Sequence, residues 1–426
     1  RGAVPERAAP QRPPAPRVEP RAVPERAREE RAGLGAPFPA IAAPPGTPEI
    51  RIGLGVGLPH APLGGGAALL VTDPDGVPVV EIPAGERWTV LAVAGGVSVS
   101  SGGWRSTPAL RLGIQAAPGL PVRVDDREYR GRLEILRDRT GLTLVNRVGL
   151  EDYLAGVVAG EMGRRLESEA AALRAQAIVS RTYAIRNRGR WRAQGFDLYA
   201  TVADQVYGGL GVENALARAA VEATTGLILT YEGAPIDAFF YSTCGGRTAE
   251  GTEVFANARR PYLRAVWDQD AGGEAYCRIS PRYRWRHEWS GEELRGMLRR
   301  TLPPVTGTAA EAITEIRSLR VAKVTASGRV AALAIGLRRG EVAVNGQGAV
   351  RQVLRPAPDQ PLRSNRFTLT ATARDGRLAH LVAEGGGAGH GVGFCQWGAV
   401  GRARAGQETD AILAAYYPGT QLHRLY

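Results

Sequence analysis

Two neighbouring stretches of the chain decide the fold: GLEDYLAGVVAGEM at residues 149–162 and LESEAAALRAQAIVSRTYAIRNR at residues 166–188. In the first stretch, apolar side chains recur at the spacing of one helix face, namely Leu150, Tyr153, Leu154, Val157 and Val158. The second stretch is rich in alanine, the residue with the highest intrinsic helix propensity. Its apolar face is formed by Leu166, Ala170, Leu173 and Ala177. We therefore predict two successive helices.

Upstream of these helices, residues 49–147 contain short apolar runs separated by turn residues. The runs include VPVVEI, ALRLGI and LTLVNRV, and the sequence DPDG at 73–76 is one of the turn signals between them. This pattern is typical of short β-strands joined by tight turns. Residues 49–147 are therefore predicted to form a smaller, β-rich N-terminal unit, whose role the residue pattern leaves open.

Downstream of the helices, strand and helix patterns follow one another without the regular alternation of βαβ units. Helices are predicted at 213–224 and at about 290–300, and strands at LILTYEG, IDAFFYST, 316–337 and 364–383. A Gly-rich loop, GGGAGHGVGFCQWG at 385–398, precedes a closing helix. The fold class predicted for the chain is α+β, with mixed strands and helices, and residues 148–426 are expected to form one larger domain.

The first 48 residues differ in composition from the rest. They are rich in proline, repeat the hexapeptide AVPERA at 3–8 and 22–27, and lack apolar periodicity. We predict a disordered, semi-extended linker at 1–48. The chain starts at Arg1 without the apolar core of a signal peptide, as a processed precursor would. No apolar run approaches the ~18 residues that span a bilayer, so no integral membrane segment is expected.

The chain is strongly basic. It holds 54 Lys and Arg against 42 Asp and Glu, a formal net charge of +12, and its pI is near 10.1. This balance favours a polyanionic partner such as nucleic acid, an anionic membrane surface or an acidic wall polymer. The basic residues are mostly scattered arginines, without a run interleaved with aromatic residues. Nucleic acid is therefore not expected as a partner.

The chain has three cysteines, Cys244, Cys277 and Cys395. None belongs to a C-x-x-C pair, so the spacing excludes a zinc ribbon or a thioredoxin-type motif. The odd number leaves at least one thiol unpaired within the chain. A disulfide between Cys244 and Cys277 is compatible with an oxidising compartment, but the sequence does not establish it.

One carboxylate of the first helix differs from its neighbours. On a helical wheel, Glu161 falls in the middle of the apolar stripe, whereas Glu151 and Asp152 point to the polar side. A carboxylate on a buried face loses hydration, and its pKa rises towards the range in which it can donate a proton near neutral pH. A general acid acting on a glycosidic bond needs this property. Alternatively, Glu161 lies at a fraying helix end beside Gly160 and Gly163 and reaches water.

Arg181 lies on the flank of the second helix and has two interpretations: it orients Glu161 or a sugar hydroxyl, or it extends to the surface along an apolar stripe.

Two loops, YSTCGG at 241–246 and GHGVGFCQWGA at 389–399, hold glycines that allow a close approach to a ligand. The loops offer donors and acceptors suited to sugar, namely Ser242, Thr243, His390 and Gln396. Because His390 stands between two glycines, it has little local side-chain packing, which favours a functional role.

Seven motifs, in this order, resemble those of the SpoIID/LytB family: LEDYLAGVVAGEM, LRAQAIVSRTYA, QVYGG, FYSTCGG, PYL, GHGVGFCQWGA and YYPGT. The likeness covers roughly residues 49–426. It implies that residues 148–426 form a SpoIID-like catalytic domain that cleaves peptidoglycan glycan strands between N-acetylmuramic acid and N-acetylglucosamine without water. Glu161 matches the family's catalytic glutamate and Arg181 its helix arginine, although two extra residues separate them here. The substrate-binding residues that the resemblance implies are Gln205, Tyr241, Ser242, Thr243, Cys244, His390 and Gln396.

The resemblance also implies a mechanism and a location. Glu161 would protonate the glycosidic oxygen and then, as a carboxylate, take a proton from the muramoyl 6-hydroxyl as that oxygen attacks the anomeric carbon, leaving a 1,6-anhydro sugar. One carboxylate can suffice because the nucleophile belongs to the substrate. The expected location is extracytoplasmic, in the cell envelope, after removal of a signal peptide, and a cell-wall amidase is a candidate partner.

The sequence departs from the family at one place. Some members carry a Cys/His/Cys cluster before QVYGG that can hold zinc, whereas the corresponding residues here are Tyr199, Ala203 and Asp204. We therefore predict no metal at that place and no cofactor.

Two alternatives to the lyase remain open. The first is a glycan-binding protein that stimulates a cell-wall amidase. The second is a thiol nucleophile, Cys244 or Cys395, with His390 as its base, for which no orienting Asn or Asp is identifiable.

Overall fold

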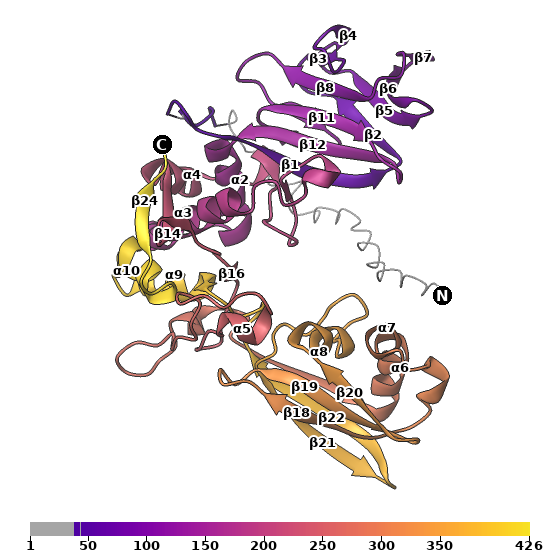
Figure 1. The fold of residues 1–426 in the computed structure, drawn as a ribbon, viewed down its shortest axis with the longest axis vertical. Coiled ribbons are helices and arrows are strands. Elements are labelled where there is room, and N and C mark those ends of the chain that lie inside the picture. Colours follow the sequence, from indigo (N-terminus) through magenta and orange to yellow (C-terminus); the bar gives the residue numbers. More distant parts are fainter. Residues whose placement is uncertain (1–37, 43) are drawn as a thin grey trace, which may run out of the picture. The chain divides into compact units, whose positions relative to one another are not determined.

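A computed structural model describes residues 38–42 and 44–426 (Figure 1). Most of the predicted linker at 1–48 lies outside the described residues. The elements below all belong to the unit Ala40–Tyr426, and together they confirm the α+β class. None of the described helices has both the length and the apolar character needed to cross a membrane.

The strands between residues 49 and 149 form most of two sheets, drawn in indigo and purple in Figure 1. The first sheet has the order β13 (Leu198–Tyr199), β1 (Glu49–Leu58), β12 (Leu142–Gly149), β11 (Arg132–Arg137), β8 (Arg111–Ala116), β3 (Leu69–Thr72) and β4 (Pro78–Ile82). The second has the order β10 (Arg127–Tyr129), β9 (Val122–Val124), β2 (His60–Gly64), β5 (Arg87–Val93), β6 (Gly96–Ser101) and β7 (Trp104–Arg105). The predicted β-rich character of this segment is therefore confirmed.

The pairing of β1 with β12 positions the helix that carries Glu161. These strands are antiparallel, from Glu49 opposite Gly149 to Leu58 opposite Leu142, with bulges where glycines interrupt β1. Strand β12 runs directly into α2 (Leu150–Met162), whose first turn holds Glu151 and Asp152. Acidic side chains there complement the positive end of the helix dipole. The helix ends where Gly163 adopts a positive φ of 67°.

Helix α2 packs against α3 (Ala170–Arg186) and α4 (Ala215–Ala223). Its residues are buried on nearly every side, with only Asp152, Gly160 and Glu161 partly exposed. A helix enclosed in this way does not follow the two-faced pattern of a surface helix. The predicted polar side at Glu151 is therefore wrong, because that residue has 0% exposure.

Later segments complete this first core. A small sheet has the order β15 (Ala234–Pro235), β14 (Leu227–Tyr231) and β24 (Gln421–Arg424). Helices α5 (Gly251–Val254), α9 (Gln396–Arg404) and α10 (Thr409–Tyr416) follow. The strand predicted at IDAFFYST shrinks to β16 (Phe240–Tyr241), which pairs in parallel with β23 (Phe394–Cys395). One continuous set of buried apolar side chains joins both large sheets to the helices.

A second set of buried apolar side chains lies between residues 285 and 383. Its strands are β17 (Arg284–Ser290), β18 (Ile316–Val324), β19 (Val330–Leu337), β20 (Glu341–Asn345), β21 (Phe367–Arg374) and β22 (Arg377–Gly386). Its helices are α6 (Gly291–Thr301), α7 (Pro303–Thr306) and α8 (Gln347–Val353). The helix predicted at about 290–300 begins with a capping box, in which Ser290 and Glu293 satisfy each other's backbone N–H groups. The division of the chain at residues 48 and 147 stays a prediction.

Candidate active site

Glu161 lies in the last turn of α2 and is half-buried. Its Oε1 accepts a 2.8 Å hydrogen bond from the backbone N–H of Val206, and its Oε2 accepts one of 3.2 Å from the side-chain amide of Gln396. Burial raises the pKa of Glu161, and the two hydrogen bonds, which favour the charged form, offset part of that rise. Glu161 thus lies neither in the middle of a buried stripe nor at a frayed end: it is held in place with part of its surface open.

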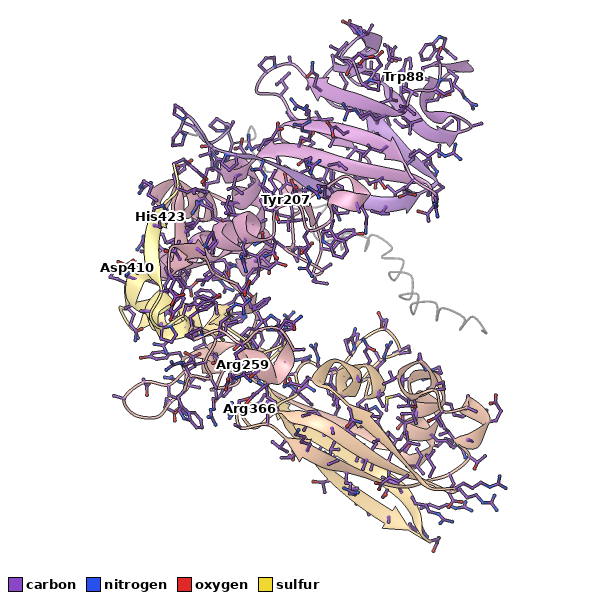
Figure 2. The ribbon with its side chains drawn as sticks, in the orientation of Figure 1. Trp88, Tyr207, Arg259, Arg366, Asp410 and His423 are labelled. Atoms are coloured by element: carbon purple, nitrogen blue, oxygen red, sulfur yellow. The ribbon has the colours of Figure 1, made fainter. Side chains whose placement is uncertain are left out.

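The segment that contacts Glu161 from one side is QVYGG, residues 205–209. Gly160 permits its approach, because a Cβ at that position would lie only 3.0 Å from the carbonyl oxygen of Val206. The side chain of Gln205 is fully buried, accepts a 3.1 Å hydrogen bond from the hydroxyl of Tyr153 and donates one of 3.4 Å to the carbonyl of Ser180. Tyr207 (Figure 2) packs on the ring of Tyr153, with centroids 4.9 Å apart. These contacts fix the backbone amide of the intervening Val206.

The two predicted glycine-containing loops meet at the other side of Glu161. Strands β16 and β23 lie side by side, and the backbone N–H of Trp397 donates a 3.0 Å hydrogen bond to the carbonyl of Ser242. This pairing places Gln396, the first residue of α9, against the carboxylate. Ser242 is half-buried, and the hydroxyl of the buried Thr243 lies 3.2 Å from that of Ser242 and 2.8 Å from that of Ser280.

His390 is enclosed by aromatic rings, so the expectation of little side-chain packing is wrong. Its ring centroid lies 5.0 Å from that of Tyr241, 5.3 Å from Phe255 and 6.2 Å from Phe239. Residues distant in sequence supply the packing that the flanking glycines lack. Its Nε2 lies 2.9 Å from the carbonyl oxygen of Phe240, and its Nδ1 accepts a hydrogen bond from the backbone N–H of Val392. Burial lowers the pKa of His390 to about 4, so at neutral pH the ring is uncharged, with the proton on Nε2.

Arg181 does not reach Glu161. Its side chain has 0% exposure and forms a two-pronged ion pair with Glu151, with Nε–Oε1 and Nη2–Oε2 distances of 2.8 Å and 2.7 Å. Its Nη1 donates a 3.0 Å hydrogen bond to the carbonyl of Leu227. Both earlier expectations for Arg181, orienting Glu161 or a sugar hydroxyl and extending to the surface, are therefore wrong. Arg181 can stay charged inside the protein because the buried carboxylate of Glu151 pairs with it. The helical wheel had placed Glu151 on the polar side, so no sequence signal pointed to this partner.

All three cysteines are buried, and none forms a disulfide. The sulfur atoms of Cys244 and Cys277 lie 3.4 Å apart, well beyond the ~2.05 Å of a disulfide bond. Cys244 and Cys395 have 0% exposure, and both ring nitrogens of His390 face backbone groups. The thiol-nucleophile alternative is therefore not supported.

Sequence reasoning missed two features near Glu161. The first is the N–H of Val206, a backbone donor to Glu161. Every residue except proline has such a group, so the only sequence signal for it was that Val206 belongs to the QVYGG motif. The guanidinium of Arg165 lies 4.4 Å from the ring centroid of the half-buried Trp397, a cation–π contact beside the Gln396 position.

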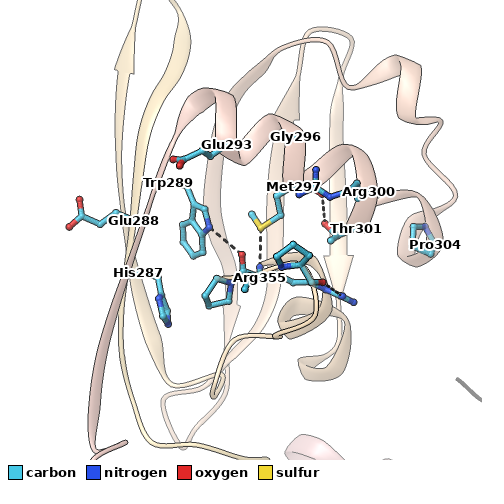
Figure 3. A pocket seen from close by; sticks show the side chains of 13 residues that line it. His287, Glu288, Trp289, Glu293, Gly296, Met297, Arg300, Thr301, Pro304 and Arg355 are labelled. Carbon is cyan, nitrogen blue, oxygen red and sulfur yellow. Dashed lines mark hydrogen bonds between the residues drawn. The ribbon is translucent and has the colours of Figure 1, made fainter. Parts of the chain in front are cut away.

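Two surface cavities lie away from these residues. One, of about 460 Å³, is lined by residues of β17, α6 and the 355–358 segment, including Trp289 and Met297 (Figure 3). The indole N–H of Trp289 donates a 3.2 Å hydrogen bond to the carbonyl of Arg355 across this cavity. The other, of about 250 Å³, is lined by residues that include Arg186, Tyr231 and Arg260. Neither cavity includes a predicted site residue.

The fold and the site define an α+β protein in which a half-buried carboxylate is held between a helix end and a glycine-rich loop. Residues 138–231 match the family model described as Stage II sporulation protein, SpoIID, and residues 274–393 match a domain of unknown function, DUF8618. The chain is 30% identical over 302 residues to Stage II sporulation protein D of Bacillus subtilis, covering 67% of this chain and 77% of that protein. It is also 30% identical over 299 residues to an uncharacterised protein of Brachyspira hyodysenteriae, covering 69% and 72% respectively.

A third relative is the amidase enhancer of Bacillus subtilis, 30% identical over 305 residues, which cover 63% of this chain and 40% of that protein. The chain belongs to the SpoIID/LytB family. This confirms the resemblance seen in the sequence motifs and gives the chain a cell-wall-related role.

Proposed function

We propose that this protein is a peptidoglycan lytic transglycosylase with Glu161 as its general acid and base. The observation that supports this most is the environment of Glu161: it is half-buried, its pKa is raised by burial, and two hydrogen-bond donors face its two oxygens. A raised pKa keeps Glu161 protonated, and so able to donate a proton, to a higher pH than an exposed glutamate. The two donors stabilise the carboxylate that remains after the proton has left. The site therefore supports both the protonated form of Glu161, which acts as the acid, and the carboxylate form, which then acts as the base.

The reaction conserves atoms without water. The carboxyl proton of Glu161 passes to the glycosidic oxygen as the bond from that oxygen to the anomeric carbon of the muramoyl sugar breaks. The carboxylate then takes the proton of the muramoyl 6-hydroxyl, whose oxygen forms the new bond to the anomeric carbon. Glu161 is again protonated, and the products are a free 4-hydroxyl end and a 1,6-anhydro-muramoyl end. One carboxylate suffices here, where hydrolases generally use two.

Other residues take supporting roles in this proposal. Gln396 and the N–H of Val206 orient the carboxylate, and the half-buried hydroxyl of Ser242 is available to a sugar. Arg181 acts as a positioning residue that fixes α2 and α3 through Glu151. The buried Gln205 and the half-buried His390, whose ring is enclosed by aromatic side chains, shape the site from behind rather than contact sugar.

The substrate is the glycan strand of peptidoglycan, and the protein works outside the cytoplasm. The net charge of +12 favours accumulation on acidic wall polymers. A second candidate function is stimulation of a cell-wall amidase, which the likeness to a protein named amidase enhancer favours. In that case Glu161 would help to grip the glycan without cleaving it.

Incubation with glycan stripped of stem peptides, followed by mass spectrometry of the products, tests the proposal. Wild-type protein is expected to release fragments with 1,6-anhydro ends, and Glu161→Gln to release none. Glu167→Gln, which changes an exposed glutamate six residues away, is the matched control and should cleave like wild type. Hydrated ends would indicate a hydrolase. Intact glycan with every variant, together with retained binding and a faster amidase, would replace the lyase by the enhancer function.

A further inference from the structure

Three cysteines and one aspartate that are far apart in sequence converge inside the first core. The thiols of Cys244, Cys277 and Cys395 and a carboxylate oxygen of Asp268 all lie within 4.8 Å of one another. Each of the four residues has 0% exposure. Because the chain has three cysteines in total, every thiol of the protein is gathered at this point. Three cysteines placed by chance in the core would not be expected to lie together beside a buried carboxylate.

Backbone donors surround the sulfur atoms. The N–H of Gly246 donates to the sulfur of Cys244 at 3.2 Å, and the N–H groups of Cys244 and Gly398 donate to the sulfur of Cys395 at 3.1 and 3.2 Å. Backbone N–H groups aimed at sulfur stabilise a thiolate more than a neutral thiol. Gly398 also makes room for the aspartate, because a Cβ there would lie 2.1 Å from Oδ2 of Asp268.

The two oxygens of Asp268 have different partners. Its Oδ1 accepts hydrogen bonds from Nε of Arg402 at 3.0 Å and from the hydroxyl of Tyr416 at 2.8 Å. Its Oδ2 faces the cysteines, 3.2 Å from the sulfur of Cys244. One oxygen is therefore fixed from behind and the other presented to the sulfurs, as an outer-shell partner orients a metal-ligating carboxylate.

From this arrangement we infer that Cys244, Asp268, Cys277 and Cys395 form a structural zinc site. Zinc prefers four ligands at the corners of a tetrahedron, and thiolate and carboxylate are both among its usual ligands. Sulfurs about 2.3 Å from zinc lie ~3.8 Å from each other in a tetrahedron, so the present spread of the four atoms needs only small side-chain shifts. The negative charge of three thiolates and one carboxylate exceeds the positive charge of Zn²⁺, and the guanidinium of Arg402 offsets part of that excess.

The site is separate from the Tyr199–Asp204 segment, where Asp204 accepts hydrogen bonds from Tyr183, Arg190, Trp191 and the N–H of Tyr199.

The site joins the loops that hold Glu161. Cys244 belongs to the YSTCGG loop, and Cys395 directly precedes Gln396, whose amide contacts Glu161. Asp268 and Cys277 bring a third segment to the same point. A zinc ion here would fix β16, β23 and the start of α9 to one another. It would act on the position of Gln396 without touching substrate.

The test begins with purified full-length protein, by measuring its metal content and its mass under denaturing conditions. We expect about one zinc per chain and three reduced thiols. After unfolding with a chelator and refolding with Co²⁺, the charge-transfer absorbance between sulfur and cobalt should have the intensity of three thiolate ligands. A chain without zinc, a mass lower by two hydrogens that maps to a disulfide, or a cobalt spectrum without thiolate ligands would overturn the inference.

Two kinds of variant locate the metal. Cys277→Ser and Cys395→Ser should each lose zinc, whereas zinc retained by both would overturn the assignment. Asp268→Asn should keep the three-thiolate cobalt band but bind zinc at least about 10-fold more weakly, because loss of a direct ligand should cost no less than loss of an outer-shell partner; an unchanged affinity would remove Asp268 from the site. Asp410→Asn, at an exposed position in α10, is its matched control. If the serine variants fail to fold, the wild-type metal content and cobalt spectrum still decide the question, and neither depends on glycan cleavage.

Discussion

The side-chain amide of Gln396 donates a 3.2 Å hydrogen bond to Oε2 of Glu161, although 235 positions separate the two residues. With the 2.8 Å bond from the N–H of Val206, it gives the carboxylate one donor for each oxygen. These donors come from the start of α9 and from the QVYGG segment. The ionisation of Glu161 therefore depends on two segments that the fold brings to the end of α2.

Replacing Gln396 by Met should move the pH profile of glycan cleavage. The amide stabilises the carboxylate, so its removal raises the pKa of Glu161 further. The alkaline limb of kcat/KM is expected to shift to higher pH, and kcat to fall about 10-fold through poorer orientation of the acid. Gln115→Met, at an exposed position in β8, should leave the profile unchanged. A Gln396→Met profile identical to wild type would show that this contact does not tune the acid.

Glu161→Gln should abolish cleavage, by about 10²–10⁴-fold or more, without loss of stability. Burial raises the folded-state pKa above its reference value of 4.5, so the folded chain binds this proton more tightly than the unfolded chain. In wild type, ionisation of Glu161 therefore lowers the free energy of unfolding as pH rises through the folded-state pKa. The Gln variant has no charge at this position, so its free energy of unfolding does not fall for this reason. Thermal unfolding at neutral pH should show the variant at least as stable as wild type, with the difference shrinking below the reference pKa. A marked destabilisation instead would point to a structural role for this carboxylate.

The sequence predicted local structure well where one kind of signal dominates. The periodicity and alanine content of 149–188 located α2 and α3, and the apolar runs VPVVEI, ALRLGI and LTLVNRV located β4, β8 and β12. It failed where tertiary contacts decide. A wheel assumes one solvent face, but α2 is enclosed on nearly all sides, so Glu151 was misplaced and its ion pair with Arg181 could not be foreseen. Likewise, no spacing along the chain shows that Cys244, Cys277 and Cys395 meet.

The buried ion pair of Glu151 and Arg181 should contribute to stability as a unit. Arg181→Met would leave a buried carboxylate without its cation, and we expect a loss of about 3–5 kcal/mol in the free energy of unfolding. The double variant Glu151→Leu/Arg181→Met should regain much of that loss, because both charges are gone. Arg186→Met is the control on the same helix: its partner is Asp237 and its side chain is 41% exposed, so the loss should stay below about 1 kcal/mol.

The double variant also tests the role of Arg181 in catalysis. If Arg181 acts only by fixing α2 against α3, a folded Glu151→Leu/Arg181→Met protein should cleave denuded glycan within about 10-fold of the wild-type rate. A stable but inactive double variant would mean that the arginine contributes to the reaction itself, as the family resemblance implied. Denaturant unfolding and cleavage should be measured on the same preparations.

His390 should make the protein sensitive to acid. Its folded-state pKa is lowered to about 4 from a reference value of 6.5, chiefly by burial, with Arg329 and Arg351 also disfavouring the charged ring. As pH falls below the reference value, the unfolded chain takes up a proton that the folded ring does not. The contribution of His390 to stability is therefore fully present above the reference pKa and is lost as pH falls towards the folded-state value, by on the order of 3 kcal/mol. In His390→Gln, this component of the pH dependence should be absent, whatever the variant's stability at neutral pH.

His423→Gln, at an exposed position of β24 (Figure 2), is the control. In unfolding experiments between the folded-state and the reference pKa of His390, it should retain the full acid-induced loss of stability. Equal slopes for wild type and His390→Gln would show that His390 titrates normally, and the enclosed, neutral ring described above would then be wrong.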